Sequence, residues 1–463
     1  MVFSSLLFIF KFLPAALILY YIAPKKAKNL VLFLVSLVFY SWGEVRYFPI
    51  MMTTIAVNYF CALGIDKFKD KKGLRLVLYL AALIISFGFL FVFKYYDFFA
   101  SNVGALGIKI PFLGLTLPLG ISFYTFQTLS YTIDVYRGKV PAEKSFINTA
   151  AFVTLFPQLI AGPIVRYTDI AAELKSRVIT PKMLEDGMED FVIGLARKVL
   201  IANNVGALWT EIESLGFSSV STGLAWLGAV AFTLQIFFDF SGYSQMAIGL
   251  GKMMGFKFPQ NFDNPYSSRS VTEFWRRWHM TLSSWFREYV YIPLGGNRRG
   301  LPRQIFNMFV VWALTGLWHG ASWNFVLWGL FYFVLLVIEK MGFLKVLERQ
   351  RVLSHIYTLF VVCIGWVIFS ITDFSSLGVF FSRLFTPHLV SNGTAAVGVI
   401  YYLRNYAVSI ALGCFFSTDL ASGLYARVRE RRWLKIVLMC ALFLVCVAYL
   451  VDSTYNPFLY FRF

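Results

Sequence analysis

The segment "TGLWHGASW", from Thr315 to Trp323, lies within an almost wholly apolar and aromatic stretch that runs from Ile305 to Ile338. A stretch of this length with so few charges predicts membrane-spanning helices. Its centre nevertheless carries a histidine, His319, between Gly316 and Gly320. An ionisable group at membrane depth is costly unless it has partners or a function. The two glycines predict a helix break there, and backbone groups freed by such a break require a cavity lined by protein.

The composition of the whole chain also indicates a membrane protein. Of its 463 residues, 58% are hydrophobic and 14% are charged, whereas about a quarter of the residues of a soluble domain are charged. We therefore predict an all-α polytopic membrane protein, a single domain over residues 1–463, with about ten to twelve transmembrane helices plus re-entrant or interfacial helices. The candidate spans are 3–22, 29–44, 49–64, 75–98, 112–136, 188–207, 222–251, 304–318, 322–340, 353–371, 397–417 and 433–451. The stretches 145–165 and 254–295 fit re-entrant or interfacial segments better.

The net charge of +18 is concentrated in loops between these spans. Loops of this kind lie on the cytoplasmic side, which places the N-terminus outside. The strongly basic loops are Lys25–Asn29, Asp66–Arg75, Lys175–Arg177, 340–351 and Arg427–Lys435. Orientation alone accounts for them; contact with anionic lipid or an anionic acyl carrier is a further interpretation. No nucleic-acid motif accompanies the basic residues, so we expect the lipid bilayer and no nucleic acid as partner.

The block from Gln260 to Gly300 contains an S-x-x-E capping box, Ser270 and Glu273, which predicts a helix that starts at Val271 and stops at Pro293. One face of that helix is aromatic and apolar: Trp275, Trp278, Leu282, Trp285, Phe286 and Tyr289. The opposite face is polar and mainly basic: Arg276, Arg277, Ser284, Arg287 and Glu288. Such an amphipathic helix is suited to lie along a membrane surface or to form the floor of a cavity. A plain interfacial anchor would have the same pattern.

Two histidines are candidates for chemistry. His279 lies at the boundary between the two faces, beside Arg276 and Arg277, which are suited to bind the phosphates of an acyl donor. A structural histidine that has its hydrogen-bond partners at the membrane interface would give the same sequence pattern. For His319, an imidazole is the natural general base for a hydroxyl acceptor, because its pKa lies near neutral pH. Alternatively, His319 has a structural role and forms a hydrogen bond in the protein core.

Other polar residues of the spans fit structural roles better. Asp239, in the apolar segment "QIFFDFSGYSQ", is expected to pair with an arginine of the 260–300 block or to cap a broken helix. The chain has four scattered histidines and no H-E-x-x-H motif, so we predict no metal site.

Several segments together carry a resemblance. They are "LPLGISFYTFQTLSYTIDVYRG" (117–138), "LFPQLIAGPIVRY" (155–167), "FFDFSGYSQMAIGLG" (237–251), "NFDNPYSSRSVTEFWRRWHMTLSSWFREYVYIPLGGNRRG" (261–300), "TGLWHGASWNFVLWGL" (315–330) and "NPFLYFRF" (456–463). With these segments the chain resembles the membrane-bound O-acyltransferase family over nearly its whole length, and closely the family's bacterial alginate O-acetyltransferase branch. Gln245 departs from the branch, which more often has aspartate there.

The resemblance implies a ring of spans with a central funnel that reaches His319 from each side. It assigns His319 as the catalytic histidine and His279 as the second histidine of the arginine-tryptophan-histidine motif. We expect donor-binding or supporting roles for Arg276, Arg277, Trp275, Trp278, Trp318, Asn324 and Asp239. The basic cluster 298–303 is a further candidate for contact with the donor.

The implied reaction moves an acyl group, acetyl in this branch, across a bacterial plasma membrane. The donor would be a cytoplasmic thioester such as acetyl-CoA or an acyl carrier, with no bound cofactor. The acceptor would be an extracytoplasmic polysaccharide or a partner acetyltransferase. D-alanyl transfer to teichoic acid from a carrier protein is the alternative enzyme. A lipid or polysaccharide transporter is the alternative without catalysis, although the chain lacks the repeated halves that many transporters have.

Overall fold

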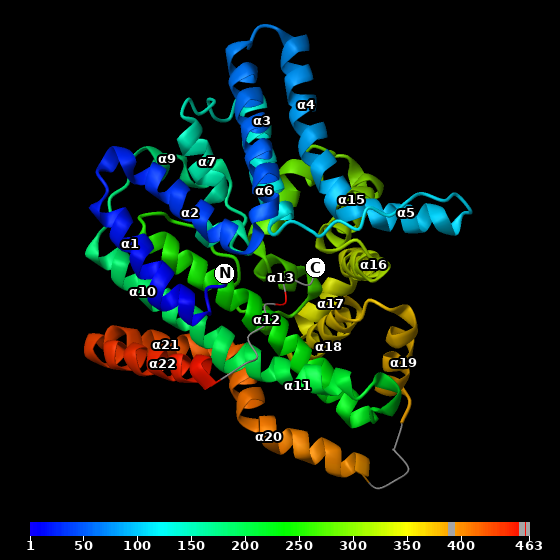
Figure 1. Ribbon diagram of the computed structural model, residues 1–463. Helices are drawn as coiled ribbons and strands as arrows, with labels where there is room; N and C mark the ends of the chain where they lie inside the picture. Colours follow the sequence, from blue (N-terminus) through cyan, green and yellow to red (C-terminus); the bar gives the residue numbers. More distant parts are fainter. Residues whose placement is uncertain (388–393, 453–458, 460–463) are drawn as a thin grey trace. The chain divides into compact units, whose positions relative to one another are not determined.

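The computed structural model describes residues 1–387, 394–452 and 459. These residues form helices joined by turns and loops, with no strand in the part described, as the predicted all-α class requires (Figure 1). His388 and most of the "NPFLYFRF" motif lie outside the described residues.

Seven helical segments of the described part are long and apolar enough to cross a membrane. They are Lys25–Lys67, Lys72–Ala105, Pro181–Ser214, Thr222–Met253, Arg351–Ser370, Gly398–Phe416 and Arg432–Asp452. The estimate of ten to twelve crossings therefore stays a prediction. One predicted span is shorter than expected: within 112–136 the helix begins only at Ile121, because Pro118 and the left-handed Gly120 (φ 72°) precede it.

The chain divides into two compact units, residues 1–191 with 244–260, and residues 192–243 with 261–463. The boundaries fall within α10 (Pro181–Ala196), within α12 (Thr222–Met253) and between residues 260 and 261, outside any helix. Up to α10, the helices are α1 (Leu13–Ile22), α2 (Lys28–Glu44), α3 (Phe48–Lys67), α4 (Lys72–Leu90), α5 (Tyr96–Ala105), α6 (Ile121–Tyr136), α7 (Phe146–Thr154), α8 (Phe156–Leu159), α9 (Tyr167–Lys175) and α10 (Pro181–Ala196). The single domain predicted from the sequence stays a prediction.

The helices after α10 are α11 (Asn203–Ser214), α12 (Thr222–Met253), α13 (Val271–Arg277), α14 (Met280–Phe286), α15 (Gly300–His319), α16 (Trp323–Ile338), α17 (Leu344–Arg349), α18 (Arg351–Ser370), α19 (Phe374–Phe385), α20 (Thr394–Phe416), α21 (Asp419–Glu430) and α22 (Arg432–Asp452). Short π-helical turns extend or join helices at Phe8–Phe12, Phe91–Tyr95, Arg197–Ala202, Arg287–Tyr291 and Glu339–Phe343. Single 3₁₀ turns occur at Lys25–Ala27, Val45–Tyr47, Phe217–Ser219 and Pro265–Ser267.

In the first unit, α3 and α4 form an antiparallel hairpin that packs with α6 (Figure 1). One buried amide joins the three helices. The Nδ2 of Asn58 donates to the hydroxyl of Ser86 at 2.8 Å, and its Oδ1 accepts from the hydroxyl of Thr132 at 2.7 Å. Hydrogen bonds of this kind between apolar helices are a usual way of fixing their packing in a membrane.

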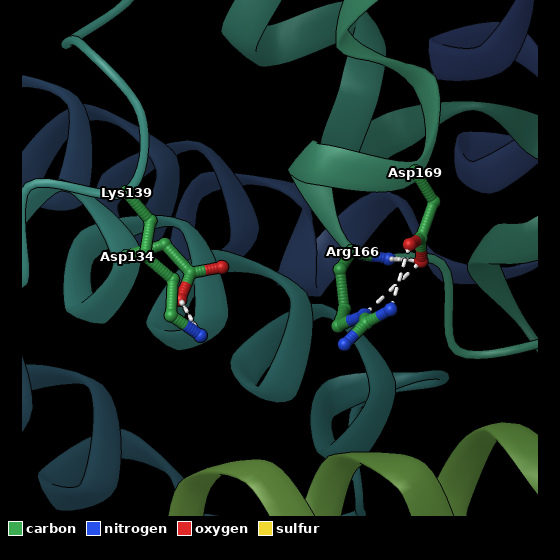
Figure 2. Close-up of polar contacts among 4 residues, drawn as sticks. All are labelled: Asp134, Lys139, Arg166 and Asp169. Atoms are coloured by element: carbon green, nitrogen blue, oxygen red, sulfur yellow. Dashed lines mark hydrogen bonds and ion pairs between the residues drawn. The ribbon is translucent and has the colours of Figure 1, made fainter.

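The end of α6 is fixed by its own backbone. Gly138 adopts a left-handed conformation (φ 72°), and the N–H of Lys139 donates to the carbonyl of Asp134 at 2.9 Å. This is a Schellman motif, in which glycine avoids the steric cost of positive φ. The side chains of the same two residues form an ion pair at 3.7 Å (Figure 2). The "IDVYRGK" segment therefore stops a helix.

The start of α9 is held by a second ion pair. Asp169 accepts hydrogen bonds from the backbone N–H of Arg166 at 2.9 Å and from its Nη2 at 2.8 Å (Figure 2). An acidic group in the first turn satisfies free N–H groups and matches the positive end of the helix. Arg166, in the "GPIVRY" motif, thus serves the local fold.

In the second unit, α15 and α16 form a close hairpin. A Cβ added at Gly316 would collide with the carbonyl oxygen of Phe325, and one at Gly329 would collide with the carbonyl of Trp312. Glycine at both positions lets the two backbones approach closely. Gly316 therefore lies inside α15 as a packing residue, and the helix ends at His319, where the sequence predicts a break.

Asp239 has a different partner from the one expected. Its carboxylate pairs with the Nζ of Lys198 at 2.5 Å and accepts the N–H of Leu459 at 2.8 Å. The expected pairing with an arginine of the 260–300 block is wrong, because Lys198 lies nearer on the neighbouring π-helical turn. Both side chains are about 3% exposed, so each charge neutralises the other in a setting where a lone charge would be very costly. The structural role predicted for Asp239 agrees with this pairing.

Candidate active site

The helix predicted from Val271 onward is broken. α13 ends at Arg277, α14 begins at Met280, and His279 between them has φ 44° and ψ 53°. The prediction of one continuous amphipathic helix is therefore wrong. Left-handed backbone is uncommon for residues other than glycine, and it persists only where surrounding contacts hold it.

The N-terminus of α13 has the serine half of the predicted capping box and an additional carboxylate, whereas the carboxylate of Glu273 accepts the N–H of Arg269 at 2.8 Å instead of that of Ser270. The hydroxyl of Ser270 accepts the N–H of Glu273 at 3.0 Å. The buried carboxylate of Glu339, which follows α16, accepts the N–H groups of Val271 and Thr272 at 2.7 and 2.8 Å. Three of the free N–H groups at this helix end are thereby satisfied, and a negative charge faces the positive end of the helix.

Asn261 holds the turn that contains His279. Its backbone carbonyl accepts the N–H of Met280 at 2.9 Å, and its Oδ1 accepts the hydroxyl of Thr281 at 2.8 Å and the backbone N–H of Thr281 at 3.3 Å. The same oxygen lies 3.0 Å from Nδ1 of His279. Because this atom accepts from a backbone N–H, it is the amide oxygen, so Nδ1 of His279 must carry the proton.

The other ring nitrogen of His279 is then an acceptor. Nε2 is buried and has no hydrogen-bond partner among the described residues. Burial lowers the pKa of His279 to about 3, so the ring is neutral at physiological pH, with a lone pair on Nε2. A buried acceptor without a partner is costly, which is a reason to expect that a reactant or water satisfies it.

His319 is packed among aromatic rings. It is the last residue of α15, and its ring makes edge-to-face contacts with Trp318, Trp328 and Phe369 at centroid distances of 5.0, 5.0 and 5.2 Å. The ring of Trp318 also lies 5.9 Å from that of His279. Edge-to-face contacts fix the plane of a ring, and Trp318 contacts both histidines.

Asn324 supports this arrangement indirectly. Its Nδ2 donates to the carbonyls of Ile368 and Phe369 at 3.3 and 3.1 Å. These carbonyls are near the end of α18, where no further helical turn can satisfy them. Asn324 therefore positions Phe369, one of the rings around His319.

Both histidines line one cavity of about 140 Å³. Its walls come from the α13–α14 region, from Tyr291 and from α15. The lining residues are Trp275, Trp278, His279, Leu282, Ser283, Phe286, Arg287, Tyr291, Val311, Trp312, Thr315 and His319. Ser283 and Arg287 are exposed, whereas both histidines are buried, so the cavity joins an accessible polar edge to a buried pair of imidazoles.

Only some of the other predicted site residues line this cavity. Trp275 and Trp278 line the cavity, but Arg276 and Arg277 do not. Arg276 is exposed, and Arg277 pairs with Glu273 at 2.7 Å. Trp318, Asn324 and Asp239 are also outside the lining.

Sequence reasoning gave no role to three residues of this region. Asn261 lies in the quoted "NFDNPY" motif, Arg287 on the polar face of the predicted helix, and Glu339 at the end of an apolar span. Only Glu339 gave a usable signal, because a carboxylate at the end of a span needs a partner.

Known proteins resemble this chain over most of its length. The sequence profile of the membrane-bound O-acyltransferase family matches residues 141–382, which include both histidines. The chain is 37% identical to the probable alginate O-acetylase AlgI of Pseudomonas putida, over 100% of both chains. It is 32% identical to the peptidoglycan O-acetyltransferase of Helicobacter pylori, over 100% of this chain and 98% of the relative.

The chain belongs to the membrane-bound O-acyltransferase family. This confirms the resemblance, and with its apolar helices it makes the protein a multi-pass membrane O-acyltransferase. The teichoic acid D-alanyltransferase of Bacillus subtilis is a more distant relative, 27% identical over 54% of this chain and 68% of its own length. Family membership decides between enzyme and transporter in favour of the enzyme.

Proposed function

We propose that this O-acyltransferase transfers acetyl groups to hydroxyl groups of a cell-surface or exported polysaccharide. The observation that carries the proposal is the single cavity shared by His279 and His319, in a chain similar over its whole length to two proteins named for O-acetylation. The donor is a cytoplasmic acetyl thioester, and the acceptor is the polysaccharide itself or a partner acetyltransferase that passes the group on.

In the proposed reaction, His319 is the general base. Its imidazole takes the proton of the acceptor hydroxyl while the oxygen attacks the thioester carbonyl. The tetrahedral intermediate then collapses, the C–S bond breaks, and the imidazolium returns the proton to the leaving thiolate. General acid–base catalysis is most efficient when the pKa of the base is near the working pH.

His279 positions a reactant. Its pKa of about 3 makes it a weak base, and its Nδ1–H donates to Asn261. Nε2 can therefore accept a hydrogen bond from an O–H or N–H group of a reactant in the cavity, but it cannot donate one to the carbonyl. The aromatic walls formed by Trp275 and Trp278 exclude water around the reacting groups, which strengthens such polar contacts.

The test uses the native host. Ester-linked groups are released from the envelope and the exopolysaccharide with mild base and identified, for the wild type and for chromosomal His319→Ala and His355→Ala strains with equal protein levels in the membrane. Nδ1 of His355 donates a hydrogen bond to the backbone carbonyl of Ser268, and this residue does not line the cavity. We expect acetate to be lost only with His319→Ala.

Two other outcomes would change the proposal. Loss of D-alanine in place of acetate would assign the enzyme to the teichoic acid reaction. Wild-type amounts of ester in the His319→Ala strain would refute the role of His319.

A further inference from the structure

A second and larger cavity lies in the first unit. Its volume is about 980 Å³, and two of the basic loops that indicate orientation in the sequence, Lys25–Asn29 and Lys175–Arg177, meet in it. Its lining residues are Tyr21, Lys25, Lys26, Lys28, Asn29, Asn148, Leu174, Lys175, Ser176, Arg177, Val178, Ile179, Thr180, Pro181 and Leu184.

The charge of this cavity is of one sign. Its five charged lining residues, Lys25, Lys26, Lys28, Lys175 and Arg177, are all cationic, and no carboxylate lines it. None of the five forms an ion pair within the part of the chain that the structure describes. A concave surface lined by one sign of charge focuses the field and attracts counter-ions. The described part of the chain therefore brings five positive charges together and supplies no carboxylate to pair with them.

Arg177 is fixed in place within this cluster. Its Nε donates to the hydroxyl of Tyr20 and its Nη1 to Oδ1 of Asn29, both at 2.7 Å, and its guanidinium lies 4.6 Å from the ring centre of Phe256. Nη2 is buried and has no hydrogen-bond partner among the described residues. A planar guanidinium held this way is preorganised to bind an oxyanion.

A purely structural role accounts for part of this cluster only. The hydroxyls of Tyr20 and Tyr21 donate to the carbonyls of Met254 and Met253 at the end of α12, and Arg177 stabilises the negative end of that helix. Lys28 contributes to this structural role, because its Nζ lies 4.5 Å from the ring centre of Tyr20. Lys25 and Lys26 are exposed, and neither forms an ion pair within the part of the chain that the structure describes.

We propose that this cavity binds a phosphate ester, and that the headgroup of an anionic phospholipid is the form it takes in the membrane. The cavity begins where the apolar helix α1 ends, and the exposed ring of Tyr21 lines it. Tyrosines and clustered lysines directly after an apolar helix are typical of the membrane interface, where anionic headgroups are concentrated. A soluble phosphate has the same chemistry, so the experiment must distinguish the two sources.

The experiment measures binding to the purified full chain in neutral detergent by native mass spectrometry. The probes are phosphatidylglycerol, phosphatidylcholine and inorganic pyrophosphate. The test variant is Lys25→Gln/Lys26→Gln/Lys28→Gln. The matched control is Lys67→Gln/Lys71→Gln/Lys72→Gln, which removes the same charge from exposed residues outside the cavity.

We expect the test variant to bind phosphatidylglycerol about tenfold more weakly or worse, because each lysine near a headgroup contributes to affinity. The control should stay within about twofold of the wild type, and phosphatidylcholine should bind weakly to all three proteins. Pyrophosphate binding that depends on the same lysines, without phosphatidylglycerol binding, would support the phosphate site with a soluble ligand and overturn the lipid assignment. Equal losses in both variants, or no loss in either, would overturn the site.

Discussion

The two histidines of one cavity have different surroundings. His279 is in a strained turn, and hydrogen bonds to Asn261 fix which of its nitrogens carries the proton. His319 is at a helix end, and the edges and faces of three aromatic rings fix the plane of its ring. A hydrogen bond determines which nitrogen of an imidazole carries the proton, whereas edge-to-face contacts determine the orientation of the ring.

This difference separates the tasks of the two residues. A histidine locked as a neutral acceptor with a low pKa is suited to hold a reactant. In the proposed reaction, His319 is the general base, which takes the proton of the acceptor hydroxyl. The contrast leads to three predictions.

The largest expected effect is on the rate of acetyl transfer, and it should differ between substitutions of the two histidines. We expect His319→Gln to lower the rate of acetyl transfer by about 10³-fold, because it removes the base. His279→Gln should lower the rate by about 10²-fold, because it removes only a positioning contact. The measurement is acetyl transfer by the purified enzyme with a thioester donor.

The control is His355→Gln, which should keep wild-type activity, since His355 lies outside the cavity. A larger loss with His279→Gln than with His319→Gln would reverse the two roles.

A smaller effect should depend on pH. In Asn261→Asp, a carboxylate replaces the amide oxygen beside Nδ1 of His279, and this negative charge raises the pKa of the imidazole. Below that raised pKa, Nε2 carries a proton and can no longer accept a hydrogen bond. We therefore expect the variant to transfer acetyl groups about tenfold more slowly at pH 6 than at pH 8. In the wild type the pKa of His279 is about 3, so protonation of this residue causes no decrease in rate between these pH values.

The pH profile of acetyl transfer checks this prediction. Asn261→Ala is the companion variant: it removes the hydrogen bond without adding a charge, so its loss should be similar at both pH values. An Asn261→Asp profile parallel to that of the wild type would show that His279 does not act as an acceptor.

The smallest effect should come through packing. Asn324→Ala leaves the carbonyls of Ile368 and Phe369 without their donor, and we expect the free energy of unfolding to fall by about 1–3 kcal/mol. Looser support for Phe369 should also lower transfer several-fold. The control is Asn204→Ala, because Asn204 also donates to two backbone carbonyls, those of Val199 and Leu200, away from the cavity.

Thermal unfolding in detergent and acetyl transfer should be measured on both variants. If Asn204→Ala lowers transfer as much as Asn324→Ala at equal stability, then Asn324 has no specific link to His319.

Hydrophobic length and pattern were sufficient to predict many of the long helices. Apolar stretches of the right length place α2, α3, α15, α16, α18 and α22 close to their observed bounds, because in a bilayer a helix is the only way for a single segment to satisfy its own backbone. Between the predicted spans 353–371 and 397–417 the structure has a further helix, α19, which the apolar pattern did not indicate.

The sequence pattern singled out both histidines that line the cavity, but it did not predict the geometry around them. Helical periodicity across residues 271–292 gave no sign of the break at His279, because the turn is imposed by Asn261, which lies 18 residues earlier. The partner of Asp239 was likewise hidden, since Lys198 is far from it in sequence. Contacts between distant segments decide such details, and a local pattern does not encode them.

One helix supports both halves of the site. Near its start, α16 carries Asn324 and Trp328, which hold the surroundings of His319; directly after its end, Glu339 caps the helix that leads to His279. Each residue inserted into or deleted from a helix rotates everything beyond it by about 100° and shifts it by about 1.5 Å. Evolution can therefore exchange the exposed apolar side chains of α16 freely, but a change in its length would disconnect Glu339 from α13, so the spacing between Asn324 and Glu339 should vary less among relatives than the residues between them.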